Sequence, residues 1–363
     1  YFLKESEGTI IMYNGLTGAI CVLDEESYGL YGRLASQKED KVVPEDPAAK
    51  SFLRDMLMGG YIKYNKADEV GFISGVINNS RSADNPVLTI APTMDCNFKC
   101  PYCFEGEKNR EYMSQNTERN VIKCVEHMIS EASGKDKNIS VTWFGGEPTM
   151  ALDIVYRLSD NLMKIAEENH AGYTSSMISN GYLFDGKVAE ELSKRNVVSV
   201  QFTIDGYPEQ HDKRRPLKNG EGTFHTIIEN VKEAAEFIKT VSIRVNVDSN
   251  NIREMDKLLD AFEAVNLPKT IPISLGRVES STKACRSVSE AVLDVPELAR
   301  EEVKVFKMMM ERNYIIDSLP EPYAGFCGAV RKHTLLVHPS GDIYKCWNTI
   351  GDKIECLGNI NDD

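Results

Sequence analysis

The sequence predicts an α/β protein built around a parallel sheet, with a smaller unit before it and a cysteine-bearing segment after it. Six apolar runs of strand length alternate with helical patterns from Val87 to Gly276: VLTIAP, ISVTWF, YTSSMIS, VVSVQFTI, VSIRVNVD and TIPISLG. This repetition favours parallel strands joined by crossover helices, as an open doubly wound sheet or a partial (β/α)6 TIM-like barrel. Both place their sites at the carboxyl ends of the strands. The expected domains are residues 1–80, 81–280 and 281–363.

The first 80 residues have their own pattern. Two apolar runs flank Asn14-Gly15 and Thr17-Gly18, which predicts a hairpin. Asp24 is the expected N-cap of one helix, and residues 49–58 form a second that ends at Gly59-Gly60. Residues 61–64 (YIKY) then read as a strand, and residues 78–86 (NNSRSADNP) as a linker.

Composition excludes several classes of protein. The 363 residues are 42% hydrophobic and 27% charged, which is typical of a globular chain. The formal net charge of −13 and the lack of a basic cluster argue against nucleic-acid binding, and the lack of a bilayer-length apolar run argues against membrane insertion. Nine cysteines, unevenly clustered in a large chain, favour metal binding in a reducing, cytoplasmic compartment over a disulfide framework.

Three of these cysteines lie together directly after the first strand of the repeating pattern. Cys96, Cys100 and Cys103 have the spacing C-x3-C-x2-C. A structural zinc site usually has four ligands, and a [4Fe–4S] cluster likewise presents four iron corners. Three thiolates would leave one iron open to bind a substrate or cofactor, and the loop after the first strand would place it at the site end of the sheet.

The stretch CNFKCPYC resembles the signature of the radical S-adenosylmethionine (SAM) enzymes, with the aromatic Tyr102 before the last cysteine. The resemblance implies a [4Fe–4S] cluster whose open iron is chelated by SAM. It also implies an external electron donor of the flavodoxin or ferredoxin type, and cleavage of SAM to methionine and a hydrogen-abstracting 5′-deoxyadenosyl radical.

The second predicted strand ends in WFGGEP, which resembles the family's GGEP motif for the methionine amino group. Gly145 and Gly146 would let the backbone approach a ligand closely, and strand-end carbonyls can accept hydrogen bonds from an ammonium group. Glu147 adds negative charge near that cation. A plain strand-terminating turn would also use Gly-Gly and Pro.

Two further strand ends and one loop fit the same resemblance. It places Ser179 and Asn180 of SNG, and Thr203 and Asp205 of TIDG, in the SAM pocket. The stretch HDKRRPLKNGEGTF resembles H-D-x-x-R…G-x-G-T-F of peptide-modifying members and makes Arg215 a candidate carboxylate contact; the alternative is a solvated surface arginine.

The C-terminal cysteines resemble the opening of the SPASM extension, which holds auxiliary [4Fe–4S] clusters. Cys327, Gly341 and Cys346 follow its C-x13-G-x4-C spacing. Cys285 and Cys356 are further candidate ligands. A full SPASM domain continues with more grouped cysteines, which this chain lacks, so the resemblance implies either a tail outside the chain or a partial auxiliary (twitch-like) site.

The N-terminal unit resembles the PqqD-like winged-helix recognition element, which binds the leader of a precursor peptide as an added strand. The alternative is a stabilising or dimerising appendage. Together the resemblances imply a maturase of a ribosomally synthesised peptide, of the ranthipeptide or sactipeptide type, that forms a thioether between a cysteine sulfur and a carbon.

Three alternatives remain open at this point. A carbon–carbon crosslinking or epimerising maturase would share the same front half. An anaerobic sulfatase-maturating enzyme, which forms formylglycine, would share TIDG and the SPASM opening but does not usually carry a leader-binding element. A non-catalytic zinc–cysteine scaffold would bind peptides through its N-terminal unit alone.

Overall fold

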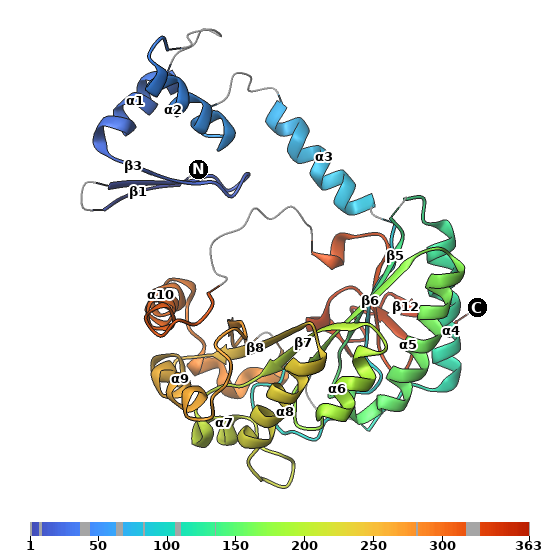
Figure 1. Cartoon of the computed structure of the whole chain (residues 1–363). Helices are drawn as coiled ribbons and strands as arrows, with labels where there is room; N and C mark the ends of the chain where they lie inside the picture. Colours follow the sequence, from blue (N-terminus) through green and yellow to red (C-terminus); the bar gives the residue numbers. More distant parts are fainter. Residues whose placement is uncertain are drawn as a thin grey trace. The chain divides into compact units, whose positions relative to one another are not determined.

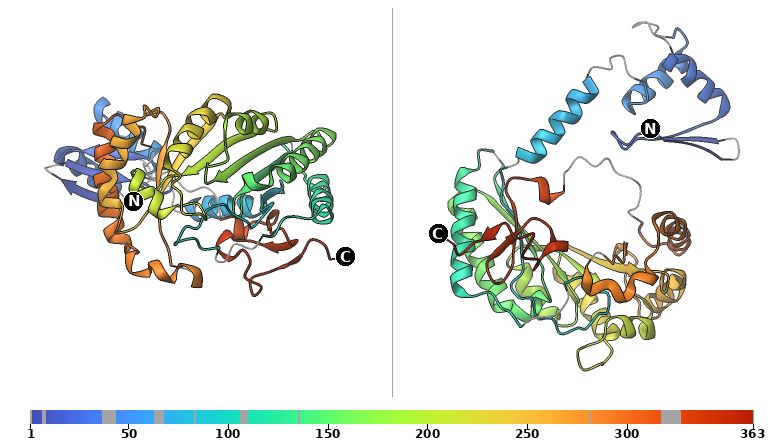
Figure 2. Two further views of the ribbon diagram at one scale, coloured as in Figure 1. Left: turned by 90° about the horizontal axis from the view of Figure 1, so that it is seen from below. Right: turned by 180° about the vertical axis from the view of Figure 1, so that it is seen from behind.

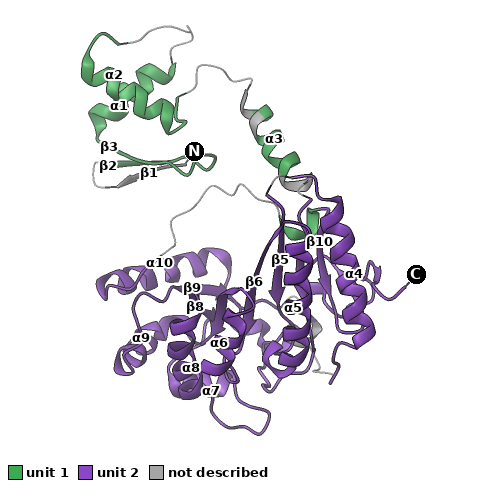
Figure 3. Ribbon diagram, turned by 45° about the vertical axis from the view of Figure 1, so that its right-hand side comes forward, with its two compact units in different colours: residues 1–83, 318–331 green, residues 84–317, 332–363 purple. Residues whose placement is uncertain are grey.

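The computed structural model describes residues 2–6, 9–36, 44–62, 68–82, 84–105, 110–134, 136–280, 282–316 and 327–362. The chain divides into two compact units, residues 1–83 with 318–331 and residues 84–317 with 332–363 (Figure 3). None of the described helices is both long enough and apolar enough to cross a bilayer.

The first unit joins a three-stranded antiparallel sheet to helices. Its strands are β1 (Phe2–Ser6), β2 (Thr9–Tyr13) and β3 (Ile20–Leu23), in the order β1-β2-β3. The predicted hairpin is confirmed, since Tyr13 pairs with Ile20 and Ile10 with Leu23. The helices are α1 (Glu25–Ser36), α2 (Pro47–Met58) and α3 (Asp68–Ser82).

Asp24 caps α1, as predicted: its carboxylate accepts a hydrogen bond from the Ser27 amide at 2.8 Å. The small core of this unit is made by buried residues from the sheet and the helices: Met12, Leu23, Tyr31, Leu53, Met56, Tyr61 and Ile62.

Two local predictions in this unit were wrong. Tyr61 and Ile62 are not in a strand, because both amides bond the Met56 carbonyl, at 2.8 and 3.2 Å, and so close the end of α2; residues 63–64 lie outside the described residues. The predicted linker begins inside α3, which continues to Ser82. Asn and Ser lower helix propensity only modestly, so a polar composition alone did not end the helix.

All six predicted strands of the second unit are confirmed. They are β4 (Val87–Ile90), β5 (Asn138–Trp143), β6 (Gly172–Ser179), β7 (Val197–Thr203), β8 (Thr240–Val247) and β9 (Ile273–Arg277), parallel and side by side in chain order. A doubly wound sheet would reverse its strand order. Right-handed crossovers in a constant order place every helix on the same face, which is the arrangement of a partial barrel (Figures 1 and 2).

The connecting helices are α4 (Gln115–Glu131), α5 (Leu152–Glu168), α6 (Gly186–Ser193), α8 (Phe224–Phe237) and α9 (Met255–Ala264). The short α7 (Pro208–Arg214) was not predicted, and α10 (Val295–Glu311) follows the barrel. Single 3-10 turns or short 3-10 segments are η1 (Pro148–Ala151), η2 (Ile252–Glu254), η3 (Lys283–Ala291), η4 (Gly328–Val330) and η5 (Trp347–Thr349).

The predicted C-terminal hairpin extends the same sheet. Its strands are β10 (Thr334–Val337), β11 (Asp342–Tyr344) and β12 (Gly358–Asn359). β10 pairs in parallel with β4, Thr334 opposite Val87, so the full order is β12-β11-β10-β4-β5-β6-β7-β8-β9.

The core of this unit lies between the outer face of the sheet and the helices, and it includes Leu88, Ile90, Val141, Val200, Phe202, Ile243 and Val245 with Val121, Val125, Leu158, Val231 and Leu258. On β8 the buried Val241, Ile243 and Val245 alternate with half-buried polar residues. Alternation of this kind sends the polar side chains to the opposite, inner face, where a site can form.

Candidate active site

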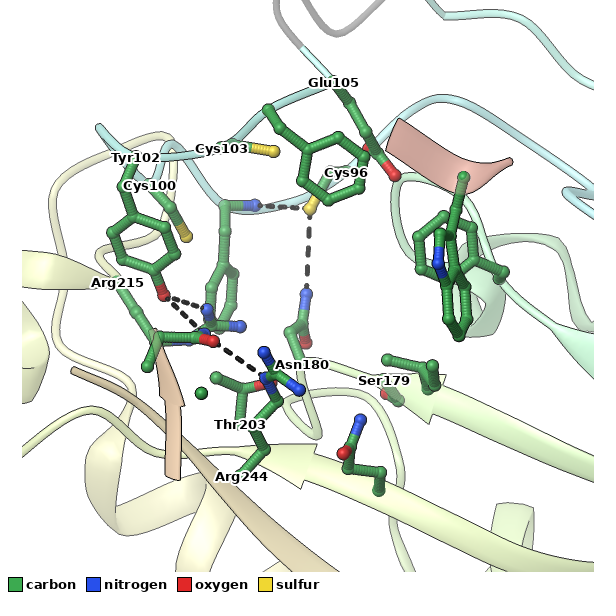
Figure 4. A pocket seen from close by; sticks show the side chains of 18 of the residues that line it. Cys96, Cys100, Tyr102, Cys103, Glu105, Ser179, Asn180, Thr203, Arg215 and Arg244 are labelled. Atoms are coloured by element: carbon green, nitrogen blue, oxygen red, sulfur yellow. Dashed lines mark hydrogen bonds between the residues drawn. The ribbon is translucent and has the colours of Figure 1, made fainter. Parts of the chain in front are cut away.

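A cavity of about 760 Å³ opens at the carboxyl ends of the barrel strands. This volume is typical of sites that take a cofactor or a drug-sized ligand. Most residues predicted from the motifs line it together (Figure 4): Cys96, Cys100, Tyr102, Cys103, Gly145, Gly146, Glu147, Ser179, Asn180, Thr203 and Arg215. Asp205 is fully buried and does not line the cavity.

The three-cysteine loop directly follows β4 and is anchored at its base. The Thr93 hydroxyl donates to the Glu111 carbonyl at 2.7 Å, and Lys218 forms an ion pair with Asp95 at 2.8 Å. Burial opposes ionisation of Asp95, but the hydrogen bond and charge of Lys218 outweigh it and lower the pKa of this carboxyl. The loop is therefore held at both flanks while its thiols face the cavity.

The donor set fits an iron–sulfur cluster. The Cys96 sulfur accepts hydrogen bonds from the Phe98 amide at 3.4 Å and from Asn180 Nδ2 at 3.8 Å. Such bonds stabilise a thiolate and tune the potential of a bound cluster. Among the described residues, no three His, Cys, Asp or Glu side chains are grouped closely enough to hold a single metal ion. This finding is compatible with a [4Fe–4S] cluster, because each thiolate would then bind a separate iron and the three sulfurs need not surround one ion.

The GGEP glycines pack against the base of the cysteine loop. Glycine is therefore required here for a reason other than the predicted close approach to a ligand. Gly145 has a φ of +111°, and a Cβ atom there would lie 2.5 Å from the Thr93 carbonyl oxygen. A Cβ on Gly146 would lie 2.5 Å from the Met94 carbonyl and closer still to that of Asp95. The close approach that requires glycine is thus to protein backbone.

The same turn still presents acceptors suited to an ammonium group. The amides of Gly146 and Glu147 bond the carbonyls of Thr93 and Asp95 at 3.1 and 2.9 Å. Within the described chain, no hydrogen bond uses the carbonyls of Gly145 and Gly146. Two strand-end carbonyls at the cavity therefore fit the amino group of SAM.

Replacing Gly146 by Val is expected to lower both the iron content and the affinity for SAM. The branched side chain would displace the backbone of Met94 and Asp95, which leads directly into Cys96. Iron and sulfide per chain after anaerobic reconstitution measure the effect. Gly134→Val is the matched control, because the nearest atom to a Cβ at Gly134 is 3.9 Å away. Normal iron with weakened SAM binding alone would instead indicate that the glycine faces the ligand.

Glu147 connects two strand ends. Its Oε1 accepts from the Thr149 amide at 3.1 Å, the Thr149 hydroxyl at 2.7 Å and the Ser179 hydroxyl at 2.8 Å, while Oε2 accepts from the Asn180 amide at 2.7 Å. The side chain is 1% exposed. These four donors balance the buried carboxylate and fix the turn after β5 against the end of β6.

Tyr102 is held by a polar network beneath the cysteine loop. Its hydroxyl donates to Asp205 and accepts from Arg215 Nη1, and Asn246 Nδ2 lies 3.4 Å away. Burial raises the pKa of Tyr102 well above its ordinary value, against the opposing charge of Arg215 and with the support of Asp205. The phenol therefore remains a neutral donor. Asp205 thus acts on the site through Tyr102 and Arg215.

The residues of the HDKRR stretch position Arg215. His211 is fully buried; burial and the charges of Arg215 and Arg214 lower its pKa well below its ordinary value, so its ring is neutral. Its Nδ1 accepts from the Asp205 amide at 3.1 Å, so we assign the hydrogen to Nε2, which donates to Thr223 Oγ1 at 3.1 Å. The Thr223 hydroxyl in turn donates to the Arg215 carbonyl at 2.8 Å.

The GxGTF part of that stretch forms the start of α8. Asp212 Oδ1 accepts from the amides of Thr223 and Phe224 at 2.7 and 2.9 Å, which satisfies the N-cap amide and the first amide of the helix. Gly222 leaves room for this carboxylate, since a Cβ there would overlap Asp212 Oδ2. The motif is therefore a scaffold that presents one arginine to the cavity.

The other predicted cysteines lie outside the cavity lining. Cys285 is buried, and its thiol donates to the Tyr102 carbonyl at 3.4 Å, next to the cluster loop. Cys346 and Cys356 both belong to the connection between β11 and β12. Cys327 is exposed and falls in the segment grouped with the first unit. Their role as auxiliary-cluster ligands stays a prediction.

Three polar residues on the barrel strands were missed by sequence reasoning. Gln201 on β7 and Arg244 and Asn246 on β8 also line the cavity. For Arg244 and Asn246 the signal was present in VSIRVNV, where polar residues alternate with Val and Ile. The part of the cavity wall that includes the C-terminal segment is aromatic. The ring centroid of Phe144 lies 5.4 Å from that of Trp347 and 6.4 Å from that of Phe104.

Comparison with known protein families identifies the barrel. The model of the radical SAM superfamily matches residues 90–262, which span the cysteine loop, the GGEP turn and α9 up to Phe262. These residues form a radical SAM domain. The predicted fold and enzyme class are therefore confirmed, and the superfamily implies a [4Fe–4S] cluster and SAM.

Relatives with known activities are similar over different parts of the chain. Mycofactocin maturase MftC of Mycolicibacterium smegmatis is 26% identical over 306 residues, which cover 78% of this chain and 69% of MftC. A cysteine-type anaerobic sulfatase-maturating enzyme of Clostridium novyi is 28% identical over 172 residues, 47% of this chain and 45% of that enzyme. The chain spans about half the length of several curated relatives that it matches.

Among solved structures, Streptococcus suis SuiB bound to its precursor peptide SuiA has a TM-score of 0.55 and 16% identity. The match covers 99% of this chain and 85% of SuiB. At this identity the likeness supports the fold alone.

Proposed function

We propose that this chain is a radical SAM maturase of a ribosomally synthesised peptide and that it joins a cysteine sulfur of the core peptide to a carbon through a thioether. The observation that carries the proposal is the shared cavity, because it brings three thiols, two free strand-end carbonyls and a polar barrel wall to one opening. A radical SAM site separated from such an open cavity would have no place for a peptide.

The residues have defined parts in this proposal. Cys96, Cys100 and Cys103 hold the cluster, and the carbonyls of Gly145 and Gly146 accept from the SAM amino group. When bound and reduced by an external flavodoxin- or ferredoxin-type donor, the cluster supplies the electron that cleaves SAM to a hydrogen-abstracting radical. Tyr102 and Asp205 orient Arg215, which offers its charge to the SAM carboxylate.

Auxiliary [4Fe–4S] clusters belong to the same proposal. Closing a thioether from a carbon radical and a thiol releases one proton and one electron. An auxiliary cluster that uses Cys346 and Cys356, with Cys285 as a further candidate, would accept that electron. The strand order supports this proposal, because β10 pairs on one side with β4, the strand from which the cysteine loop emerges, and on the other with β11, which Cys346 follows.

The first unit is proposed to bind the leader of the precursor. β3 pairs only with β2 among the described strands, so its other edge is open to an added strand. The outer face of this sheet is apolar, with Val22 63% and Ile20 46% exposed. An apolar face next to an open edge fits a peptide that supplies both main-chain hydrogen bonds and apolar side chains. The likeness to MftC, which is itself named a maturase, also favours this function.

A second candidate is formylglycine formation on a cysteine of a sulfatase, favoured by the similarity to the Clostridium novyi enzyme. The N-terminal unit favours the peptide maturase over the sulfatase-maturating enzyme, because a sheet with an open edge can bind the leader of a precursor peptide. Carbon–carbon crosslinking and epimerisation would use the same cavity residues.

Co-expression with any short, cysteine-containing reading frame found next to the gene tests the proposal. A thioether lowers the peptide mass by two hydrogens and protects one cysteine from alkylation. Formylglycine would react with a hydrazine probe, and epimerisation would leave the mass unchanged. An unmodified peptide, with a folded and iron-loaded enzyme, would contradict the proposal.

A further inference from the structure

The floor of the cavity carries an arginine that the proposed SAM contacts leave without a function. Arg244 lies on β8 and lines the cavity on the strand side, opposite the cysteines (Figure 4). Within the described part of the chain, no carboxylate lies within ion-pair distance of its guanidinium. Two other charged residues of the lining differ in this respect: Arg277 is paired with Glu279 at 2.9 Å, and Glu147 is satisfied by four donors.

The guanidinium is fixed in one orientation. Arg244 Nε donates to Asn246 Oδ1 at 2.9 Å, and the Asn246 amide donates to Asp205 Oδ1 at 2.8 Å. The side chain passes over Gly276, where a Cβ would lie 2.5 Å from Nε and overlap Nη2 and the central carbon of the guanidinium. Because Nε is already used, Nη1 and Nη2 remain as the free end of the fork.

Two neighbouring donors complete the arrangement. Thr203 is the register partner of Arg244 on β7, and Gln201 lies two residues earlier on the same strand. Both line the cavity, and neither side chain makes a hydrogen bond within the described residues. An oriented guanidinium with free Nη atoms, next to a hydroxyl and an amide, is the donor set that a carboxylate accepts in bidentate form.

Arg244 lies on a different strand from the proposed acceptors of the SAM amino group. The amino and carboxylate groups of SAM share one carbon, and the proposed ammonium acceptors, Gly145 and Gly146, follow β5. β8 is three strands away, about 14 Å along the sheet at the usual strand spacing. Arg215 reaches the same network as Arg244, because Arg215 Nη1 and Asn246 Nδ2 both contact the Tyr102 hydroxyl and Arg244 Nε bonds Asn246 Oδ1. A binding measurement therefore has to separate a substrate carboxylate from the carboxylate of SAM.

We propose that Arg244, with Thr203 and Gln201, binds the side-chain carboxylate of an Asp or Glu in the peptide substrate and so selects an acidic residue next to the reacting position. This rests on the proposed function, because it assumes that a peptide enters the cavity. A partly buried cation without a partner carboxylate is costly, and a substrate carboxylate offsets that cost.

Two blocked tripeptides, acetyl-Gly-Asp-Gly-amide and acetyl-Gly-Asn-Gly-amide, test the proposal as matched probes. Their relative affinities are measured by ligand-observed NMR on the anaerobic, cluster-loaded full chain with saturating SAM. We expect the Asp probe to bind about tenfold more tightly, as one charge-assisted bidentate contact implies. The preference should fall to about one in Arg244→Gln and be partly kept in Arg244→Lys.

Two further variants make the test specific. Gly276→Ala keeps the charge but displaces the guanidinium, so it should also reduce the preference. Arg277→Gln removes a cavity arginine that is already paired, so it should keep the preference. Equal binding of both probes by the wild type, or a preference that persists in Arg244→Gln, would overturn the proposal.

The SAM carboxylate is the competing source of the same chemistry. If it occupies Arg244, Arg244→Gln will weaken SAM binding and the wild type will not distinguish the two probes, which also overturns the proposal. Failure of the proposed function gives a different result: no peptide would be modified, although the probes would still be distinguished.

Discussion

Replacing Cys96, Cys100 and Cys103 together by Ala should abolish formation of 5′-deoxyadenosine from SAM after reduction. The three thiols lie on one loop and line one cavity, so removing them leaves the proposed cluster without protein ligands. Activity is expected to fall to the level of a sample without enzyme, while iron bound at any auxiliary site remains. Anaerobic reduction followed by chromatography of the nucleoside products measures the loss.

Cys124→Ala is the matched control for this experiment. Cys124 lies on α4, where its sulfur contacts the Met128 sulfur at 3.8 Å, and burial raises the pKa of its thiol. It behaves as a small apolar side chain, so its loss should leave SAM cleavage intact. SAM cleavage by the triple variant would show that the cluster is held elsewhere.

Deleting residues 1–83 should leave SAM cleavage in place but slow modification of the leader-bearing precursor by roughly 100-fold or more. A roughly 100-fold effect is at the low end of the gain in binding that a tethered module gives. The cut preserves Asp84 and Asn85, which bond Ser133 and Asn138 within the second unit. Mass spectrometry of the precursor over time gives the rate.

This deletion needs its own controls. Far-UV circular dichroism and iron content must show that the truncated chain is folded and loaded. The excised unit added in trans should restore part of the rate. Full-rate modification without residues 1–83 would contradict the leader-binding role and favour the sulfatase-maturating alternative.

The barrel was predictable because its signals are local. Each strand is an apolar run followed by a helical pattern, and six such units in succession leave few topologies. The pairing of β10 with β4 was not predictable in this way, since it joins residues about 250 positions apart and no local pattern specifies the partner. Residues 61 and 62 were predicted to be in a strand, but their amides bond the Met56 carbonyl at the end of α2 and do not pair with another strand.

The site was predictable as a set of motifs but not as a set of physical roles. Spacing and resemblance brought the cysteines, the GGEP turn and Arg215 together, and the structure places all of them at one cavity. The role of Gly146 was not predictable, because the backbone that it contacts lies about 50 residues earlier in the chain. Arg244 was missed because an arginine in a strand usually indicates exposure; only its alternation with Val and Ile marks the inner face.

Transfer of deuterium from the peptide to 5′-deoxyadenosine tests the central claim most directly. The precursor is prepared with deuterated amino acids in its core, and the reduced wild-type enzyme is given this peptide and unlabelled SAM. The account predicts that deuterium appears in 5′-deoxyadenosine in step with peptide modification, because the radical formed at the Cys96–Cys103 loop takes its hydrogen from the core peptide. The contradicting result is a peptide that carries deuterium at every core position and is modified, while the 5′-deoxyadenosine formed contains no deuterium.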